Sequence, residues 1–351
     1  MRTPPASLAR PARPARIEDV ARATGVSIMS VSRAMRGVEG VSPGTRQRIL
    51  ETAATLGYVP NRVAGALATA GSNLVGISVP TLFDGVFAEM IEGMRAPLLR
   101  AGLETIIETS DYSHRRVDAW IDRMLTWSPT AIVLCGTDHS PRARQRLAAS
   151  TIPVLEFWDV TDDPINLCVG IDHRAAGRAM GAHLIRLGYR RPGYVGIATG
   201  RDPRAEKRFQ GLAEAFAAAG TGFVADIRRA EAPTFVAGRG GCADILDLPG
   251  DAPDVLCFLN DHLAFGGLME CAARGLSVPG GIGIVGFNDL AINAVLPVRL
   301  TTSATPRELI GRTAARTLIG ALRGVRQQAV TVIPVEIDPG GTTRPVRDGS
   351  S

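Results

Sequence analysis

The sequence predicts a small all-α module near the amino terminus, followed by a larger α/β region divided into two lobes. Three observations support this prediction. Short helical patterns fill residues 16–60, strand and helix patterns alternate from Leu74 onward, and the alternating part holds more strands than one sheet comfortably accommodates. Such alternation is typical of parallel sheets with right-handed crossovers, so we expect two doubly wound parallel sheets.

The small module is expected to contain three short helices over residues 16–61. Gly25 interrupts the first helical pattern, and a second helix begins near Ser27. A third helix follows Ser42. Serine is a suitable N-cap because its hydroxyl can accept a hydrogen bond from a free backbone amide, and Pro43 suits the first helical position. Helices this short bury little apolar surface, so we expect a small separate domain.

In the α/β region, short apolar runs alternate with helical stretches. The predicted strands are residues 74–80, 104–110, 131–136, 153–159, 168–171, 194–199, 255–260 and 283–288. The helical stretches between and after them include residues 86–101, 114–127, 174–187, 205–219, 262–274 and 306–323. We expect one domain over 73–345, with one lobe at about 73–171 plus 301–327 and the other at about 172–300 plus 328–345.

Positive charge is concentrated near the amino terminus. Residues 1–70 contain ten arginines and four acidic residues, a net charge of +6. The whole chain carries +5, so residues 71–351 carry −1. This asymmetry predicts a polyanionic partner for the first segment alone. Residues 1–15, with three arginines and four prolines, are expected to form a disordered basic arm.

The composition argues against several classes of protein. Apolar residues make up 45% of the chain and charged residues 21%, which is ordinary for a globular protein. No apolar run reaches about 18 residues, so we expect no membrane span. The five cysteines are widely spaced, and histidine, cysteine and carboxylate residues show no metal-ligand spacing. We therefore expect a cytoplasmic protein with free thiols, no metal and no cofactor.

The stretch IEDVARATGVSIMSVSRAMRG predicts a helix-turn-helix, with Gly25 as the small residue at the turn. In the second helix, Val31 belongs to the inward apolar face. Ile28 and Met29 at the exposed start suit thymine methyl groups, and Arg33 can bind a guanine edge. An ordinary helical hairpin would explain the periodicity but not these exposed apolar residues. The predicted phosphate contacts are Ser27, Ser30, Ser32 and Asn61.

Polar side chains follow several predicted strands. Because the carboxyl ends of parallel strands line a common cleft, these side chains are candidates for binding a small molecule. Carboxylate, amide and guanidinium groups each bind two hydroxyls at once, which suits a polyhydroxylated ligand. The candidates, with one aromatic residue placed to stack on a sugar face, are Phe87, Glu156, Asp159, Arg204, Arg208, Asn260, Asn288 and Asp289.

Some of these positions have simpler structural interpretations. Phe87 is equally well explained as a core residue. Asp172 and Asp261 lie where helix N-caps are expected. Arginines at 201, 204 and 208, close together after one strand, favour an anionic ligand such as a sugar acid.

The run DVARATGVSIMSVSRAMRG…VSPGTRQRILETAATLGYVPNRVAGALAT closely resembles the LacI/GalR family of bacterial repressors, and the similarity continues at lower density to about residue 340. The resemblance implies a two-lobed sensor domain like that of periplasmic binding proteins. It implies that Ile28, Met29 and Arg33 face bases of double-stranded operator DNA. It also implies a homodimer on an inverted repeat. No leucine heptad follows residue 340, so a dimer is favoured over a tetramer.

The same resemblance implies a hinge over residues 62–72, in which 62–69 form a helix on operator DNA. Leu67 lies where the family wedges a leucine into the minor groove, which unstacks a base step and kinks the duplex. A plain linker residue is the alternative interpretation of Leu67. Arg62, at the start of the hinge, is included among the predicted DNA contacts.

Several segments resemble the gluconate-operon repressor branch of the family, among them MLTWSPTAIVL, TDHSPRARQRL and TPRELIG. Arg208 in RFQGLAEAF matches the family's ligand-binding arginine, whereas Asn288 replaces an aspartate common in the family. The resemblance implies a sugar acid such as gluconate as effector, with Arg204 and Arg208 at its carboxylate. The hydroxyl contacts implied by the resemblance are Glu156, Asp159, Asn260, Asn288 and Asp289.

Two other classes of protein are alternatives, a doubly wound enzyme and a periplasmic sugar-binding protein. The segment GGIGIVGF contains GxGxxG, but its last glycine lies inside a predicted strand instead of opening a helix. A periplasmic protein would need a signal peptide and would have no use for residues 16–60. We therefore expect a DNA-binding repressor, not an enzyme, whose operator affinity depends on an effector. The sequence leaves open whether the effector weakens or strengthens DNA binding.

Overall fold

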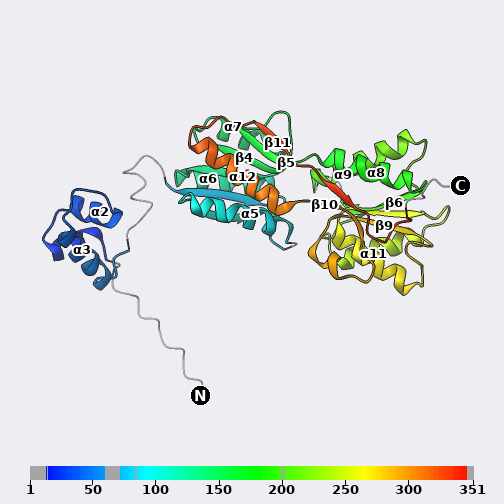
Figure 1. Cartoon of the computed structure of the whole chain (residues 1–351), viewed down its shortest axis with the longest axis horizontal. Coiled ribbons are helices and arrows are strands. Elements are labelled where there is room, and N and C mark those ends of the chain that lie inside the picture. Colours follow the sequence, from blue (N-terminus) through cyan, green and yellow to red (C-terminus); the bar gives the residue numbers. More distant parts are fainter. Residues whose placement is uncertain are drawn as a thin grey trace, which may run out of the picture. The chain divides into compact units, whose positions relative to one another are not determined.

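The computed structural model describes residues 13, 15–59, 72–83, 85–198, 200 and 202–345. The chain divides into two compact units, Met1–Ser72 and Asn73–Ser351 (Figure 1). Among the described residues, no helix combines the length and apolar character that a membrane crossing requires. Most of the predicted basic arm, and all of the predicted hinge except residue 72, lie outside the described residues.

The first unit contains the three predicted helices, α1 (Ile17–Thr24), α2 (Ile28–Arg36) and α3 (Pro43–Thr55). Gly25 ends α1 with a φ of 69°, a conformation that other residues rarely adopt. The Ser42 hydroxyl accepts a hydrogen bond from the Thr45 amide, so the predicted N-cap of α3 is confirmed. Buried residues from all three helices form the core, namely Val20, Ala21, Val31, Ala34, Ile49 and Ala53.

The second unit contains two six-stranded sheets. The first sheet has the strand order β11-β5-β4-β3-β1-β2, and all its pairings are parallel. Its strands are β1 (Leu74–Val79), β2 (Glu104–Thr109), β3 (Ala131–Cys135), β4 (Val154–Asp159), β5 (Leu167–Ile171) and β11 (Val330–Val332).

The second sheet has the order β12-β10-β9-β8-β6-β7, and only β12 pairs antiparallel. Its strands are β6 (Pro192–Ile197), β7 (Ala225–Arg229), β8 (Val255–Phe258), β9 (Gly283–Asn288), β10 (Thr301–Ala304) and β12 (Glu336–Asp338). Two largely parallel sheets confirm the predicted fold class.

In the first lobe, helices cover both faces of the sheet. α5 (Val86–Arg100) packs on α12 (Arg307–Leu322) over one face, while α6 (His114–Thr126) and α7 (Pro141–Ala148) share an apolar cluster with the other. The contact between α5 and α12 requires glycine. A Cβ on Gly311 would lie 1.9 Å from the Met90 carbonyl oxygen, so the two backbones approach too closely for any side chain there.

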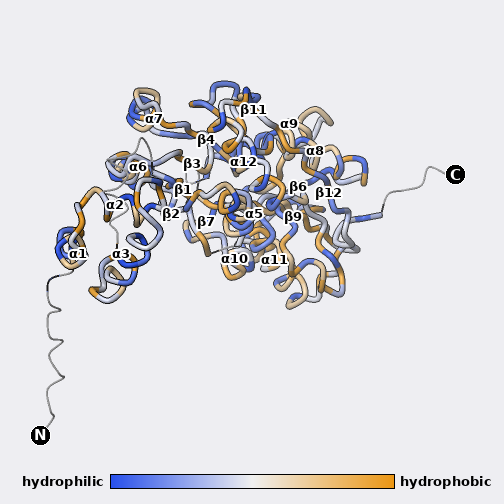
Figure 2. The backbone as a smooth tube through the Cα atoms, turned by 60° about the vertical axis from the view of Figure 1, so that its left-hand side comes forward, coloured by the Kyte–Doolittle hydropathy of each residue, from blue (hydrophilic) through white to orange (hydrophobic). Residues whose placement is uncertain are grey.

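In the second lobe, α8 (His173–Arg186) packs on α9 (Pro203–Ala218), and α10 (Phe235–Leu246) packs on α11 (Asp261–Ala273). Hydrophobic and hydrophilic stretches alternate along α8 and α9, as expected for helices that pack on one side (Figure 2). A Cβ on Gly177 of α8 would lie 2.1 Å from the Arg208 carbonyl oxygen. Close packing of α8 against α9 thus sets the position of Arg208.

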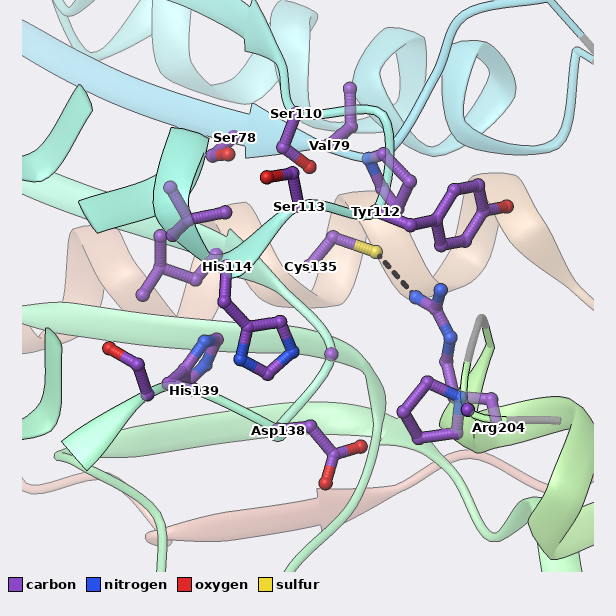
Figure 3. Close-up of a pocket in the computed structure, with 17 residues that line it drawn as sticks. Ser78, Val79, Ser110, Tyr112, Ser113, His114, Cys135, Asp138, His139 and Arg204 are labelled. Carbon is purple, nitrogen blue, oxygen red and sulfur yellow. Dashed lines mark hydrogen bonds between the residues drawn. The ribbon is translucent and has the colours of Figure 1, made fainter. Parts of the chain in front are cut away.

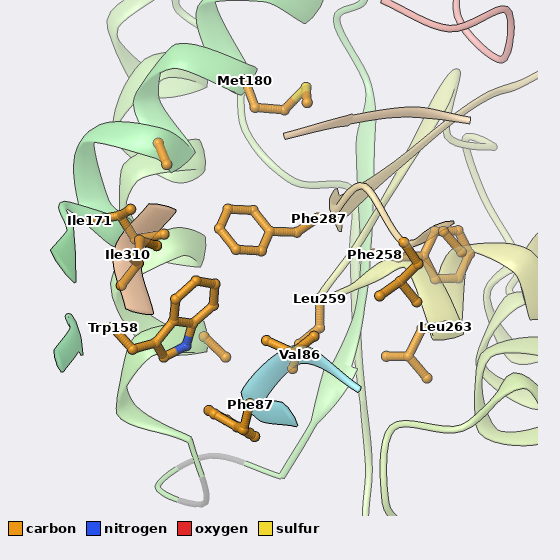
Figure 4. Close-up of a cluster of buried hydrophobic side chains, with 14 of the residues drawn as sticks. Val86, Phe87, Trp158, Ile171, Met180, Phe258, Leu259, Leu263, Phe287 and Ile310 are labelled. Atoms are coloured by element: carbon orange, nitrogen blue, oxygen red, sulfur yellow. The ribbon is translucent and has the colours of Figure 1, made fainter. Parts of the chain in front are cut away.

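The apolar core continues from one lobe into the other. Figure 4 shows Val86 and Trp158 of the first lobe in one buried cluster with Leu259 and Phe287 of the second. The chain crosses between the lobes after β5, after β10 and after β11. The lobes are therefore joined by side-chain packing as well as by three chain segments.

The predicted lobe boundaries are wrong near the carboxyl terminus. β10 pairs with β9, so residues 301–304 belong to the second lobe. β11 pairs with β5, so residues 330–332 belong to the first. Both strands are short and lack a distinctive apolar pattern. The strand with which each one pairs decides its lobe, and the local sequence does not reveal that pairing.

Candidate functional site

The start of α2 places two apolar side chains at the surface of the first unit. Ser27 caps the helix, and its Oγ accepts a hydrogen bond from the Ser30 amide at 3.1 Å. Ile28 is 48% exposed and Met29 is 60% exposed, whereas Val31 is buried. Both side chains are therefore accessible, and their contact with bases stays a prediction.

Arg33 lies in the last turn of α2 and is exposed. A Cβ on Gly40 would lie 3.1 Å from its Nη1, so the arginine extends along the loop that precedes α3. Ser32 is half-buried on the same helix. The predicted DNA contacts that lie outside the described residues are Asn61, Arg62 and Leu67.

The second unit contains a cavity of about 100 Å³ at the carboxyl ends of β1, β2 and β3 (Figure 3). Most of its lining comes from the first lobe, but Arg204 belongs to the first turn of α9 in the second lobe. The cavity is therefore formed where the lobes meet. Its main polar lining residues are Ser78, Ser110, Tyr112, Ser113, His114, Asp138, His139, Ser140 and Arg204.

Arg204 is a buried cation at this cavity. Its Nε donates to Asp202 Oδ1 at 2.9 Å and its Nη1 to Cys135 Sγ at 3.1 Å, and its Cζ lies 5.7 Å from both the Phe87 and the Tyr112 ring centres. Burial alone would lower the pKa of the guanidinium. The Asp202 carboxylate has the opposite effect and helps to hold this pKa above its usual value, so Arg204 stays charged. Burial raises the pKa of the Cys135 thiol to about 12, so it stays protonated.

Hydroxyl and imidazole groups line the first-lobe side of the cavity. Ser78 and Ser110 are buried residues, and within the described part of the chain their hydroxyls have no hydrogen-bond partner. Ser113 and Ser140 instead cap α6 and α7. Two free hydroxyls at the cavity are suited to a ligand with hydroxyls of its own. Sequence reasoning missed both residues because a serine within a strand, like Ser78, or directly after one, like Ser110, has no distinctive pattern.

Two of the predicted carboxylates already have protein partners. Glu156 is fully buried, accepts the Ile165 amide at 2.7 Å, and has an oxygen 3.1 Å from His139 Nε2. It therefore lies behind a cavity-lining imidazole. Asp159 lies 2.5 Å from the Lys207 Nζ, an ion pair that joins β4 of the first lobe to α9 of the second.

Arg208 is also buried, in the core between the lobes. Its Nη1 lies 3.0 Å from His173 Nδ1, its Nη2 donates to the Leu259 carbonyl at 3.4 Å, and its Cζ lies 4.3 Å from the Phe287 ring centre. Burial, and then the Arg208 charge, hold the pKa of His173 well below its usual value. A neutral His173 accepts from Arg208 and donates through Nε2 to the Trp158 carbonyl at 3.1 Å.

The other predicted effector residues lie at the ends of second-lobe strands or in the core. Asn260 caps α11 by accepting from the Leu263 amide, while Asp261 occupies the next position. Asn288 and Asp289 follow one another at the end of β9. Phe87 is 3% exposed, so it contributes to the core beside Arg204. The structure thus brings Phe87 and Arg204 together, and it places Arg208 in a separate buried contact.

A helix-turn-helix unit followed by a two-lobed α/β unit, with a polar cavity between the lobes, defines a DNA-binding protein that carries a small-molecule-binding domain. Two family models match accordingly. The model for bacterial regulatory proteins of the lacI family matches residues 16–61, and that for a periplasmic binding protein-like domain matches residues 182–343.

Individual relatives match over nearly the whole chain. The HTH-type transcriptional regulator GntR of Pseudomonas aeruginosa is 36% identical, covering 90% of this chain and 92% of that protein. IdnR of Escherichia coli K12, also an HTH-type transcriptional regulator, is 30% identical, covering 88% and 92%. A crystal structure of a LacI-family regulator from Silicibacter pomeroyi has a TM-score of 0.88 at 36% identity, covering 94% and 99%. The chain therefore belongs to the LacI family of DNA-binding transcriptional regulators. These relatives are regulators and not enzymes.

Proposed function

We propose that the chain is a repressor that binds an inverted-repeat operator as a homodimer, and that a gluconate-like sugar acid in the lobe cavity controls its operator affinity. The observation that carries the effector proposal is the buried, charged Arg204 guanidinium in a cavity with free serine hydroxyls. The resemblance to the gluconate-operon repressor branch, together with the GntR and IdnR relatives, supports the sugar-acid class.

On the DNA side, Ile28, Met29 and Arg33 contact bases, because two exposed apolar side chains at a helix start suit thymine methyl groups. Ser27, Ser30 and Ser32 contact phosphates. The segment 62–72 acts as the hinge, with Leu67 in the minor groove and Asn61 and Arg62 on the backbone. A lac repressor dimer bound to operator shares the fold, at a TM-score of 0.79 and 22% identity.

On the effector side, Arg204 is the first contact of the carboxylate, because it lines the cavity. Ser78, Ser110 and His114 contact hydroxyls there. Further ligand contacts come from both lobes. Once the ligand reaches the second lobe, it is bound there by Arg208, Asn260, Asn288 and Asp289. In the first lobe it is also bound by Glu156 and Asp159. Ligand binding changes the position of one lobe relative to the other and thereby the packing of the hinge segments. Coupling of this kind is typically worth about 1–3 kcal/mol per site.

Two measurements test the proposal. Selection from random duplexes with the full chain is expected to yield an inverted repeat, and an asymmetric site would contradict the dimer. Calorimetry is expected to show binding of D-gluconate but not of D-glucose. Arg204→Gln should weaken D-gluconate binding at least about tenfold, whereas Arg239→Gln, a surface ion-pair variant, should leave it unchanged. Preference for the neutral sugar would remove the sugar-acid assignment.

A further inference from the structure

Arg307 is a buried arginine at the junction between the lobes. It is the first residue of α12, directly after the crossing from β10, and is 7% exposed. α12 packs against α5, so the backbone of Arg307 belongs to the first lobe. Its side chain nevertheless contacts the second lobe.

The guanidinium of Arg307 binds groups from both lobes. Its Nε donates to Glu89 Oε2 of α5 at 2.7 Å. Its Nη1 donates to the Asn288 carbonyl and to the Thr305 hydroxyl, and its Nη2 donates to the Asp289 carbonyl at 3.1 Å. Because the guanidinium is planar and rigid, it fixes the two carbonyls and the Glu89 carboxylate in one geometry.

The backbone that Arg307 holds is strained. Asn288 has a φ of 121° and Asp289 a φ of 57°, in the region that favours glycine. Such conformations persist only where surrounding contacts maintain them. The Asn288 carbonyl also accepts the Thr305 hydroxyl at 3.1 Å, whereas its buried Oδ1 has no hydrogen-bond partner among the described residues. The main chain of Asn288 is therefore held by contacts from the β10–α12 crossing, and its side chain is left for another donor.

We propose that Arg307 is a positioning residue that couples the Asn288–Asp289 backbone of the second lobe to α12 and α5 of the first. This rests on the proposed function, in which Asn288 and Asp289 contact the effector. A ligand that binds their side chains alters the two carbonyls, and Arg307 transmits the change to Glu89 and so to the helix pair α5–α12.

The first test needs no ligand. Hydrogen exchange is measured on the full chain for Arg307→Met and for the control Arg312→Met, which removes an exposed ion pair on the same helix. Exchange in peptides covering 286–292 should rise at least tenfold for Arg307→Met and stay unchanged for Arg312→Met. Unchanged exchange in Arg307→Met would overturn the proposal. Arg307→Lys, which keeps the positive charge but not the planar fork, gives the same readout if Arg307→Met does not fold.

The second test separates coupling from binding. Operator affinity is measured with and without D-gluconate, and D-gluconate affinity is measured by calorimetry. The operator measurement is made at saturating D-gluconate, so that a weaker ligand affinity does not lower the response. In Arg307→Lys the ligand-induced change in operator affinity should fall below twofold, whereas Arg312→Lys should retain the full change. A full ligand response in Arg307→Lys at saturating D-gluconate overturns the coupling role. If the parent protein itself does not bind D-gluconate, the effector proposal fails. The exchange measurement alone then decides whether Arg307 positions the Asn288–Asp289 backbone.

Discussion

Asp261, the first residue of α11, is a fully buried carboxylate. Its oxygens accept hydrogen bonds from the Leu290 amide at 2.9 Å and the Thr302 hydroxyl at 2.7 Å. Burial nevertheless raises the pKa of Asp261 to about 6. The folded protein therefore binds this proton more tightly than the unfolded chain does. The contribution of Asp261 to stability consequently falls as the pH rises from about 4 to about 6, and stays low above that range.

Asp261→Asn should remove this dependence on pH. The unfolding free energy of the variant minus that of the parent is expected to increase by about 3 kcal/mol between about pH 4 and pH 7, from the shift of the Asp261 pKa. Urea unfolding at a series of pH values measures this difference. Asp251→Asn, which changes an exposed carboxylate, is the control for the loss of one charge. A flat or decreasing difference for Asp261→Asn would show that its carboxylate is ionised at no cost.

Met29 provides a residue-scale test of DNA reading. Because its side chain is 60% exposed, Met29→Ala should leave the unfolding free energy nearly unchanged. Operator affinity should fall at least about fivefold through the lost contact with a base. Fluorescence anisotropy on the selected duplex measures this loss, with Leu50→Ala, a 40% exposed apolar residue of α3, as the control. Equal losses in the two variants would point to a general effect on the unit instead of a base contact.

At the scale of elements, long periodic segments could be predicted and short paired ones could not. The predicted helix 306–323 is found as α12, because its apolar spacing is set by its own sequence. β10, with the sequence TTSA, is fully or half buried without any strongly apolar residue, so only its neighbour β9 reveals it as a strand. The same holds for the cavity. Arginines after a strand could be predicted as ligand-binding residues, whereas Ser78 and Ser110 become candidates only once β1 and β2 are known to lie side by side.

The contact between α5 and α12 gives a prediction at this scale. Gly311→Ala places a methyl group against the Met90 carbonyl and should reduce the unfolding free energy by about 2 kcal/mol or more, because two backbones must separate. Gly320→Ala on the same helix meets only the flexible Gln327 side chain. That variant should be neutral or stabilising by up to about 1 kcal/mol. Chemical denaturation distinguishes the two, and similar stabilities would show that the helices do not need this close approach.

The whole molecule consists of two units of very different core size. The described part of the first has a core of six buried apolar residues, whereas the second has a core that runs through both lobes. Small cores give low stability, since little surface is buried relative to the ordered chain. The units are therefore expected to unfold separately, the first at the lower temperature.

Differential scanning calorimetry of the full chain tests this expectation. Ile49→Ala, in the core of the first unit, should lower only the first transition, by an amount equivalent to about 2–4 kcal/mol. Ile284→Ala, in β9, should lower only the second. A single transition that responds equally to both substitutions would mean that the units fold as one.

Lys207 is the only lysine in the chain, and it lies in the ion pair that joins α9 to Asp159. Apart from the α-amino group, an amine-selective reagent therefore has one target in the molecule. The Lys207 side chain is one-third exposed, and its ammonium is held against a buried carboxylate, so its nucleophilicity depends on whether the two lobes stay together. Acylation kinetics followed by mass spectrometry thus provide a native reporter of lobe separation that needs no engineered label.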